Sequence, residues 1–378
     1  MSPGAGTSLA LPLPPVAVAA AAGAERLHAL QAMRAYAAAM VVFVHGLSTY
    51  GSKVDLVSLP NLFSGLGELG VKLFFCISGF IILNSSRDLV PGTRSAIVFL
   101  RRRIVRVAPI YWLATLVYAA KLGLQGIFPE ADALLFSLLF VPYANEYGLM
   151  RPVLGVGWSL NFEMFFYLAF AGTLCLGRAR RLPLLAVGFA ALLAARQAGV
   201  VGVESSGLAG IAYLLADHYL LYFLAGMVVA ALRERWLAVG RPGALGGAAI
   251  LAATTGLLAV YVAANSLGAI PRAWSEPFLA AVCVACLTLS VAEGGLVTVV
   301  GPLRRWLELA GDASYSTYLI HGFVMGPLAR LIARFELPVP ALAFALAMVP
   351  LCTLVGILCY RWVERPLLKT MNARISQQ

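Results

Sequence analysis

Residues 29–49 read ALQAMRAYAAAMVVFVHGLST, an apolar stretch long enough for a helix to cross the roughly 30 Å hydrocarbon core of a membrane. Similar stretches recur along the 378-residue chain, at 66–84, 107–123, 157–176, 182–200, 211–232, 243–265, 278–293, 312–333 and 340–363. The sequence is 61% hydrophobic and only 12% charged, which excludes an ordinary soluble domain. We therefore predict an all-α polytopic membrane helix bundle with about ten transmembrane helices.

The distribution of basic residues predicts the orientation of this bundle. The net charge is +11, and the Lys and Arg residues fall in short segments between the apolar stretches, the positive-inside pattern of membrane proteins rather than a nucleic-acid surface. This pattern places both termini in the cytoplasm, provided that the apolar segment 132–142 does not cross; its length suits a re-entrant or interfacial segment. We expect a bacterial cytoplasmic (inner) membrane protein that contacts no nucleic acid.

Three parts of the chain have different expected roles. Residues 1–24 are rich in Ala and Pro and lack a basic leading region, which predicts a disordered cytoplasmic tail. Residues 25–370 form the membrane domain, and 371–378 a cytoplasmic C-terminal tail. The six cysteines lie in apolar stretches, and even Cys283 and Cys286 lack nearby partners, so we predict no metal site.

Two ionisable residues interrupt the first apolar stretch. Arg34 and His45 are eleven residues apart, so on a helix they lie about 20° apart around the axis and ~16 Å apart along it, on one face. Buried charges in a membrane mark a cavity or a partner, and His exchanges protons near neutral pH. The alternative is that Arg34 reaches the cytoplasmic interface while His45 only hydrogen-bonds a neighbouring helix.

Glu163 lies within the aromatic run GWSLNFEMFFY at 157–167, where a carboxylate needs a partner. Its expected depth in the membrane matches that of His45. A carboxylate beside an imidazole orients the ring and raises its basicity, as a general base requires. A structural Glu–His or Glu–Arg pair that only holds helices together remains the alternative.

Two further groups of polar residues are candidates for a site. His321 shares a helical face with Ser314, Thr317 and Tyr318, which predicts either a cavity lining or a hydrogen-bonded seam between helices. A basic cluster precedes the 107–123 stretch, and its spacing places Arg106 on one face with its neighbours. Such a face suits the phosphates of a nucleotide-like cofactor or the headgroups of anionic lipids. The cluster consists of Arg101, Arg102, Arg103 and Arg106.

Six of these segments, in order along residues 26–370, resemble the membrane-bound acyltransferase-3 family. They are Arg34 with His45, the segment GVKLFFCISGFII at 70–82, Arg103 to Arg106 ahead of PIYW at 109–112, the segment WSLNFEMFFY at 158–167, the segment SYSTYLIH at 314–321, and ERP at 364–366. Within the family, the segments LFVPY at 139–143 and PVLGVGW at 152–158 are most similar to the branch that acetylates exopolysaccharides, including succinoglycan.

The resemblance implies an O-acyltransferase that transfers an acyl group, acetyl in most members, from cytoplasmic acyl-CoA to a carbohydrate hydroxyl on an exopolysaccharide or its lipid-linked precursor. In this interpretation Arg34, Arg102, Arg103 and Arg106 bind acetyl-CoA, and His45 is the general base or acyl carrier. Glu163 orients His45. Ser78, Tyr315 and His321 are candidates for the cavity lining or the oxyanion site.

Two departures from the family pattern weaken any mechanism that uses additional carboxylates. His28-Ala29 stands in the region where many members have an acidic residue, and Lys72-Leu73 precedes the Phe-Phe pair where an acid is frequent. The alternative from another class is a proton-coupled transporter or flippase, in which buried His, Glu and Arg form a proton or anion path. Such proteins commonly contain two broken helices in corresponding halves, and no two-fold repeat is evident in this sequence.

Overall fold

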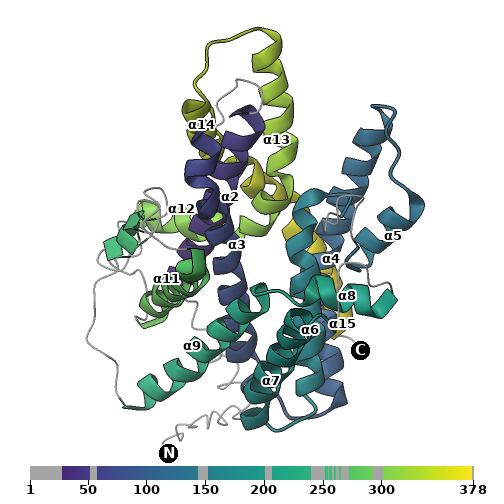
Figure 1. Ribbon diagram of the computed structural model, residues 1–378, viewed down its shortest axis with the longest axis vertical. Helices are drawn as coiled ribbons and strands as arrows, with labels where there is room; N and C mark the ends of the chain where they lie inside the picture. The colour runs from purple at the N-terminus through teal and green to yellow at the C-terminus, as the bar shows by residue number, and fades with distance from the viewer. Residues whose placement is uncertain are drawn as a thin grey trace, which may run out of the picture.

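The computed structural model describes residues 28–51, 58–143, 152–200, 207–239, 272–292 and 301–376, with isolated positions between 252 and 264. The predicted tail 1–24 lies outside the described residues, and so does the 243–265 stretch apart from those positions. The described residues contain helices and no strand, in agreement with the predicted all-α class (Figure 1). In chain order the elements are α2 (His28–Gly51), α3 (Ser58–Ser85), α4 (Thr93–Gly123), α5 (Ala131–Leu138), η1 (Gly155–Gly157), α6 (Trp158–Thr173), α7 (Arg178–Gln197), α8 (Gly207–Leu215), α9 (Tyr219–Val239), α11 (Arg272–Ala292), α12 (Gly301–Asp312), α13 (Ser314–Arg334), α14 (Ala341–Cys359), the π-helical η2 (Tyr360–Glu364) and α15 (Arg365–Ser376).

Helices α2 and α3 form the centre of the described bundle. Helix α2 packs against α3, α12, α13 and α14, and α3 also packs along α9 (Figure 1). The α3–α9 crossing is close because Gly79 and Gly226 face the partner backbone; a methyl group on either would overlap a carbonyl, of Phe223 or Cys76 respectively. Small residues at a crossing are typical of helix packing in lipid, where dispersion contacts replace the hydrophobic effect as the driving force.

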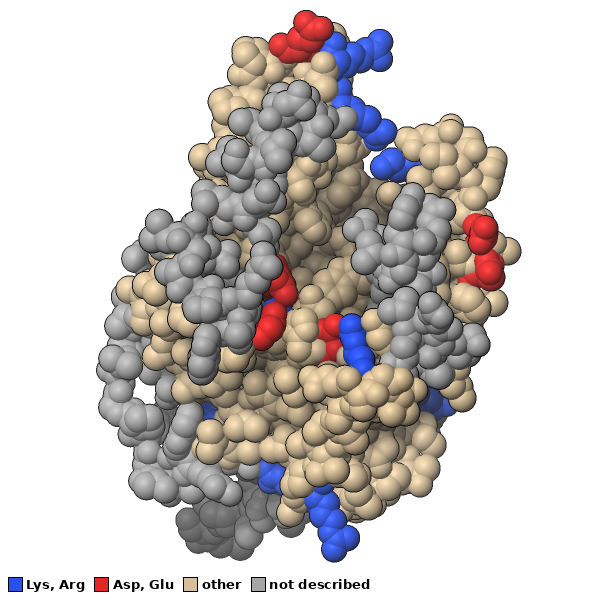
Figure 2. Space-filling view, in the orientation of Figure 1, with Lys and Arg blue, Asp and Glu red and all other residues tan. Residues whose placement is uncertain are grey.

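Four described helices have the length and composition to cross a membrane: Ala29–Tyr50, Gly65–Ser85, Thr93–Gly123 and Ala341–Ala373. The apolar helical stretches Tyr219–Arg233 and Glu276–Val291 are shorter. The outer faces of α4 and α14 expose large apolar side chains such as Leu116 and Leu346, as expected for contact with lipid. Most of the surface in Figure 2 is uncharged, and many of its Lys and Arg side chains lie toward the two ends of the long axis.

Two of the differences between the helix boundaries and the predicted spans concern polar residues. Helix α4 begins at Thr93, so the arginine cluster lies inside this helix rather than before it. The predicted 211–232 span is broken between α8 and α9, where Asp217 accepts a hydrogen bond from the Tyr219 backbone N–H at 3.3 Å. Arg196 donates to the Ala216 carbonyl at 2.8 Å and so satisfies a group freed by the break.

Two other local features follow from sequence length and composition. The eight-residue helix α5, which overlaps the predicted short segment 132–142, rises only about 12 Å, too little to cross the hydrocarbon core. At the other end of the chain, α14 continues through the π-helical turn η2 into α15, which extends through the predicted 371–378 tail as far as Ser376. Single π turns are frequent at functional sites, and this turn places the carboxylate of Glu364 inside the bundle, where it is fully buried.

Candidate active site

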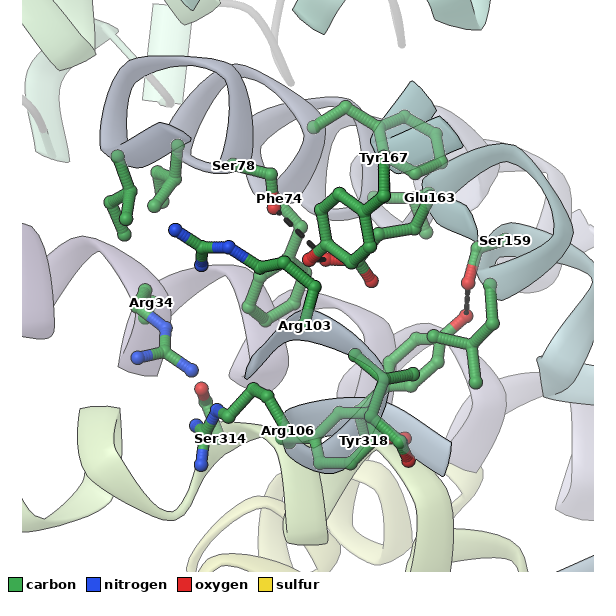
Figure 3. A pocket seen from close by; sticks show the side chains of 17 residues that line it. Arg34, Phe74, Ser78, Arg103, Arg106, Ser159, Glu163, Tyr167, Ser314 and Tyr318 are labelled. Atoms are coloured by element: carbon green, nitrogen blue, oxygen red, sulfur yellow. Dashed lines mark hydrogen bonds between the residues drawn. The ribbon is translucent and has the colours of Figure 1, made fainter. Parts of the chain in front are cut away.

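The first cavity, which we call the glutamate cavity, lies between α2, α3, α4, α6 and α13 and has a volume of about 130 Å³. Glu163 from α6 accepts hydrogen bonds from the hydroxyls of Ser78 on α3, at 3.2 Å, and of Tyr167 on its own helix (Figure 3). Tyr315 from α13 also lines the cavity, but its hydroxyl donates to the Val107 carbonyl at 2.6 Å. The buried carboxylate thus has the partners that its aromatic surroundings require.

Three guanidinium groups enter the same cavity, from Arg34 on α2 and from Arg103 and Arg106 on α4 (Figure 3). Arg106 donates to Glu364 at 2.5 Å, and Glu364 also accepts from Ser316 at 2.6 Å. With three Arg and one Glu, the lining has a formal charge of 3 − 1 = +2, which falls to +1 when Glu364, the ion-pair partner of Arg106, is counted. A cavity of this charge favours an anionic ligand.

A second cavity adjoins the first and is called here the arginine cavity. It has a volume of about 510 Å³, and its lining includes Arg102, Arg103 and Arg106, of which the last two also line the glutamate cavity. Arg103 donates to the Ser85 hydroxyl at 3.0 Å and its guanidinium lies 5.3 Å from the Phe99 ring centroid. The four arginines predicted to bind the cofactor therefore line two cavities that share residues.

A third cavity, the histidine cavity, has a volume of about 510 Å³ and is lined by His45 and His321 with residues of α2, α4, η1 and α13. The His45 Nδ1 and His321 Nε2 atoms lie 2.7 Å apart, and the two rings stack with centroids 4.9 Å apart. His321 Nδ1 lies 2.7 Å from the Tyr318 carbonyl, which can only accept, so Nδ1 carries the proton.

This hydrogen-bond chain determines the tautomers of the two rings when both are neutral. Because Nδ1 of His321 is protonated, its Nε2 is an acceptor, and His45 must donate to it from Nδ1. Nε2 of His45 then retains an unprotonated lone pair. An imidazole held in one tautomer with a free basic nitrogen is the arrangement that a general base needs.

The structure separates Glu163 from His45, contrary to the predicted contact. The two residues line different cavities, and no hydrogen bond or ion pair joins them in the described part of the chain. Similar depth in two helices does not fix how each helix is rotated about its axis, and α13 brings His321 to His45 instead. The partner that orients His45 is therefore an imidazole.

The glutamate and histidine cavities meet at a short polar boundary. The Tyr318 hydroxyl donates to the Val156 carbonyl at 2.9 Å and lies 2.8 Å from the Ser159 hydroxyl. Tyr318 and Ser159 line the glutamate cavity, whereas Val156 lines the histidine cavity. We call these three residues the partition.

Sequence reasoning did not identify a role for Glu364 or Lys72. Glu364 appeared only within the ERP segment at 364–366, although an acid directly after the apolar stretch 340–363 is a signal for a buried ion pair. Lys72 is fully buried, and its Nζ lies 2.7 Å from carboxylate oxygens of both Glu68 and Glu276. Those carboxylates and His218 could offer ligand atoms to a metal, but the Lys72 ammonium already supplies the positive charge between them.

The fold and the cavities together define a helical membrane protein with a histidine pair and a cationic pocket inside the bundle. The sequence of residues 27–361 matches the acyltransferase domain family (acyltransferase-3), and the chain belongs to this family. It is therefore an O-acyltransferase, as the resemblance of its motifs predicted.

Two relatives illustrate the range of the family. The exopolysaccharide production protein ExoZ of Rhizobium meliloti is 35% identical over 320 residues, which cover 82% of this chain and 92% of that protein. The acyltransferase MdmB of Streptomyces mycarofaciens is 28% identical over 340 residues, covering 82% of this chain and 83% of that protein. No solved structure matches the chain significantly.

Proposed function

We propose that this protein transfers an acetyl group from cytoplasmic acetyl-CoA to a hydroxyl of an exopolysaccharide or its lipid-linked precursor. The observation that carries the proposal is the His45–His321 pair, which leaves a basic nitrogen beside a cavity of about 510 Å³. The similarity to the exopolysaccharide production protein supports a carbohydrate acceptor. In this proposal the protein lies in the bacterial inner membrane with about ten spans and both termini in the cytoplasm, which the positive-inside pattern supports.

The donor, acetyl-CoA, is assigned to the arginine cavity and the adjoining glutamate cavity. Arg102, Arg103 and Arg106 hold the phosphates of CoA in the arginine cavity, because guanidinium groups bind phosphate through paired hydrogen bonds. The pantetheine arm enters the glutamate cavity past Arg34, which lies on the same helix as His45 and ~16 Å from it along the axis. The thioester reaches His45 by passing the partition.

The chemical step then uses the free nitrogen of His45. Nε2 takes the proton of the acceptor hydroxyl as its oxygen forms a bond to the thioester carbonyl carbon. The tetrahedral oxyanion collapses, the carbon–sulfur bond breaks, and the proton passes from His45 to the leaving CoA thiolate. His321 holds the His45 ring through Nδ1, and its accepting Nε2 stabilises the imidazolium that forms.

Glu163 is a positioning residue in this scheme. Its hydrogen bonds with Ser78 and Tyr167 hold the wall of the glutamate cavity, and its charge offsets part of the charge of the arginines. The donor is thereby held in one orientation before it crosses the partition.

The proposal is tested with the full chain in proteoliposomes supplied with acetyl-CoA and a lipid-linked saccharide. Free CoA and acetylated saccharide are measured together. The His45→Ala variant is expected to lose both signals, whereas Thr370→Ala, at an exposed position of α15 that lines none of the three cavities, keeps them. Full acetylation by His45→Ala would overturn the mechanism, and movement of the saccharide across the membrane without acetyl-CoA would favour a transporter.

A further inference from the structure

The histidine cavity has a charge that the chemical step does not use. Lys121 from α4 and Arg330 from α13 both line it, and its described lining contains no Asp or Glu. Among the described lining residues, the two cations therefore face one space without a compensating acid. Figure 2 shows Lys and Arg side chains gathered over α13, at the edge of the hollow between α13 and the α4–α5 region.

Aromatic rings hold Lys121 at this position. Its Nζ lies 5.2 Å from the Tyr118 ring centroid and 5.9 Å from that of Phe323, and the two rings meet edge to face at 5.8 Å. A cation over ring faces is attracted to them but keeps N–H groups free for a further acceptor. Gln125 adds a side-chain amide that can hydrogen-bond a ligand. The lining thus combines apolar ring surface, neutral polar groups and two cations.

From this combination we infer that the histidine cavity binds a saccharide acceptor that carries an anionic group, a carboxylate or a phosphate, held by Lys121 and Arg330. The inference rests on the proposed function and names the class of acceptor. An anion in the cavity neutralises two like charges that a neutral sugar leaves uncompensated. Bound in this way, the anion anchors the saccharide while one of its hydroxyls lies at His45.

Binding of three probes to the full chain in nanodiscs of zwitterionic lipid tests the inference. The probes are a neutral β-glucan tetrasaccharide, the same tetrasaccharide with one glucuronate, and the neutral tetrasaccharide joined to polyprenyl diphosphate. The wild type is expected to bind one or both anionic probes about tenfold more tightly than the neutral one, the gain typical of a charge-assisted contact. The preferred probe identifies the source of the anion.

Variants locate the preference within the cavity. Lys121→Gln combined with Arg330→Gln is expected to bring the affinity ratio of anionic to neutral probe close to one, while Lys121→Arg with Arg330→Lys keeps most of it. Arg334→Gln is the matched control, because Arg334 is exposed on the same helix, one turn further on, and does not line the cavity. Its ratio should match that of the wild type.

The outcomes separate this inference from the proposed function. Equal affinity of the wild type for all three probes, or an equal loss of preference in Arg334→Gln, would overturn the anion site. Loss of the preference when the nanodiscs contain anionic lipid would assign the two cations to lipid headgroups and overturn it as well. Selective binding of an anionic probe without any acetyl transfer from acetyl-CoA would instead contradict the proposed function and support the anion site.

Discussion

The glutamate and histidine cavities differ in how their polar groups are satisfied. In the glutamate cavity the carboxylate is bonded by two hydroxyls, and Arg106 is paired with Glu364. In the histidine cavity His45 donates a hydrogen bond to His321, and His321 donates one to a backbone carbonyl. This arrangement leaves Nε2 of His45 with a free lone pair. The histidine cavity is also larger than the glutamate cavity, at about 510 Å³ against 130 Å³.

This difference indicates that the two cavities have different roles in the reaction. A pocket whose charges are fixed by internal bonds is suited to hold a ligand in one orientation. A roomier pocket with an unused basic nitrogen is suited to take a proton from a second ligand. We therefore expect mutations in the histidine cavity to reduce kcat, and mutations around the glutamate and arginine cavities to act mainly on the KM for acetyl-CoA.

The largest expected effect distinguishes His45 from Glu163. His45→Gln keeps a side chain that can donate to His321 but cannot take a proton, so kcat should fall on the order of 10³-fold. Glu163→Gln still accepts hydrogen bonds from Ser78 and Tyr167, so its kcat should change little, while its KM for acetyl-CoA should rise about tenfold, the cost of one weakened charge-assisted contact. Steady-state transfer of labelled acetyl measures both.

The proposed difference between the two cavities is wrong if the two variants lose kcat in the opposite order. A larger loss of kcat in Glu163→Gln than in His45→Gln would make the carboxylate the base and His45 a structural residue. Equal retention of the folded fraction on size-exclusion chromatography is the control, because both substitutions remove a charge or a ring from the interior.

A second prediction concerns the tautomer of His45. His321→Ala removes the acceptor of His45 Nδ1–H, so the ring can turn or change tautomer, and kcat should fall about 10²-fold, within the range for losing part of a base–orienter pair. In His321→Gln a side-chain carbonyl can lie near the lost Nε2 and should restore most of the rate. A Gln variant as slow as the Ala variant would show that His321 does more than accept this hydrogen bond.

A third prediction tests the ion pair behind the glutamate cavity. Arg106→Ala leaves the fully buried Glu364 without its cation, and we expect the free energy of unfolding to fall by about 2 kcal/mol, below the cost for a fully buried pair because Arg106 is 32% exposed. The KM for acetyl-CoA should rise about tenfold, as for one lost phosphate contact. Glu364→Gln, which still accepts from Arg106 and Ser316, serves as the milder variant. Unfolding in SDS and initial rates provide the measurements.

The sequence predicted the helical class and most of the helices because the apolar stretches are long and uniform. It did not predict that Asp217 and His218 break one stretch, since a short polar pair near a helix end also fits a solvated terminus. The early start of α4 was missed for a related reason: a run of arginines looks like the end of a span, although the helix continues through it.

For the site, spacing along one helix was informative and pairing between helices was not. Arg34 and His45 do line cavities from the same helix, as their spacing of eleven residues predicts. The partner of His45 depends on the rotation of α6 and α13 about their axes, which an apolar pattern with a small hydrophobic asymmetry does not fix. Both His321 and Glu163 were identified as candidates, but their assignment to different cavities required the structure.

The smallest expected effect separates Arg102 from its neighbours. Arg102 lines only the arginine cavity and is exposed, so its contact with a CoA phosphate is screened by water and salt. Arg102→Gln should raise the KM for acetyl-CoA about threefold at low salt, with unchanged kcat, and the effect should shrink as the ionic strength rises. Arg101→Gln is the control, because Arg101 lines none of the three cavities. An equal rise in both variants would mean that the cluster attracts CoA through its overall charge, and that the arginine cavity does not bind a particular phosphate.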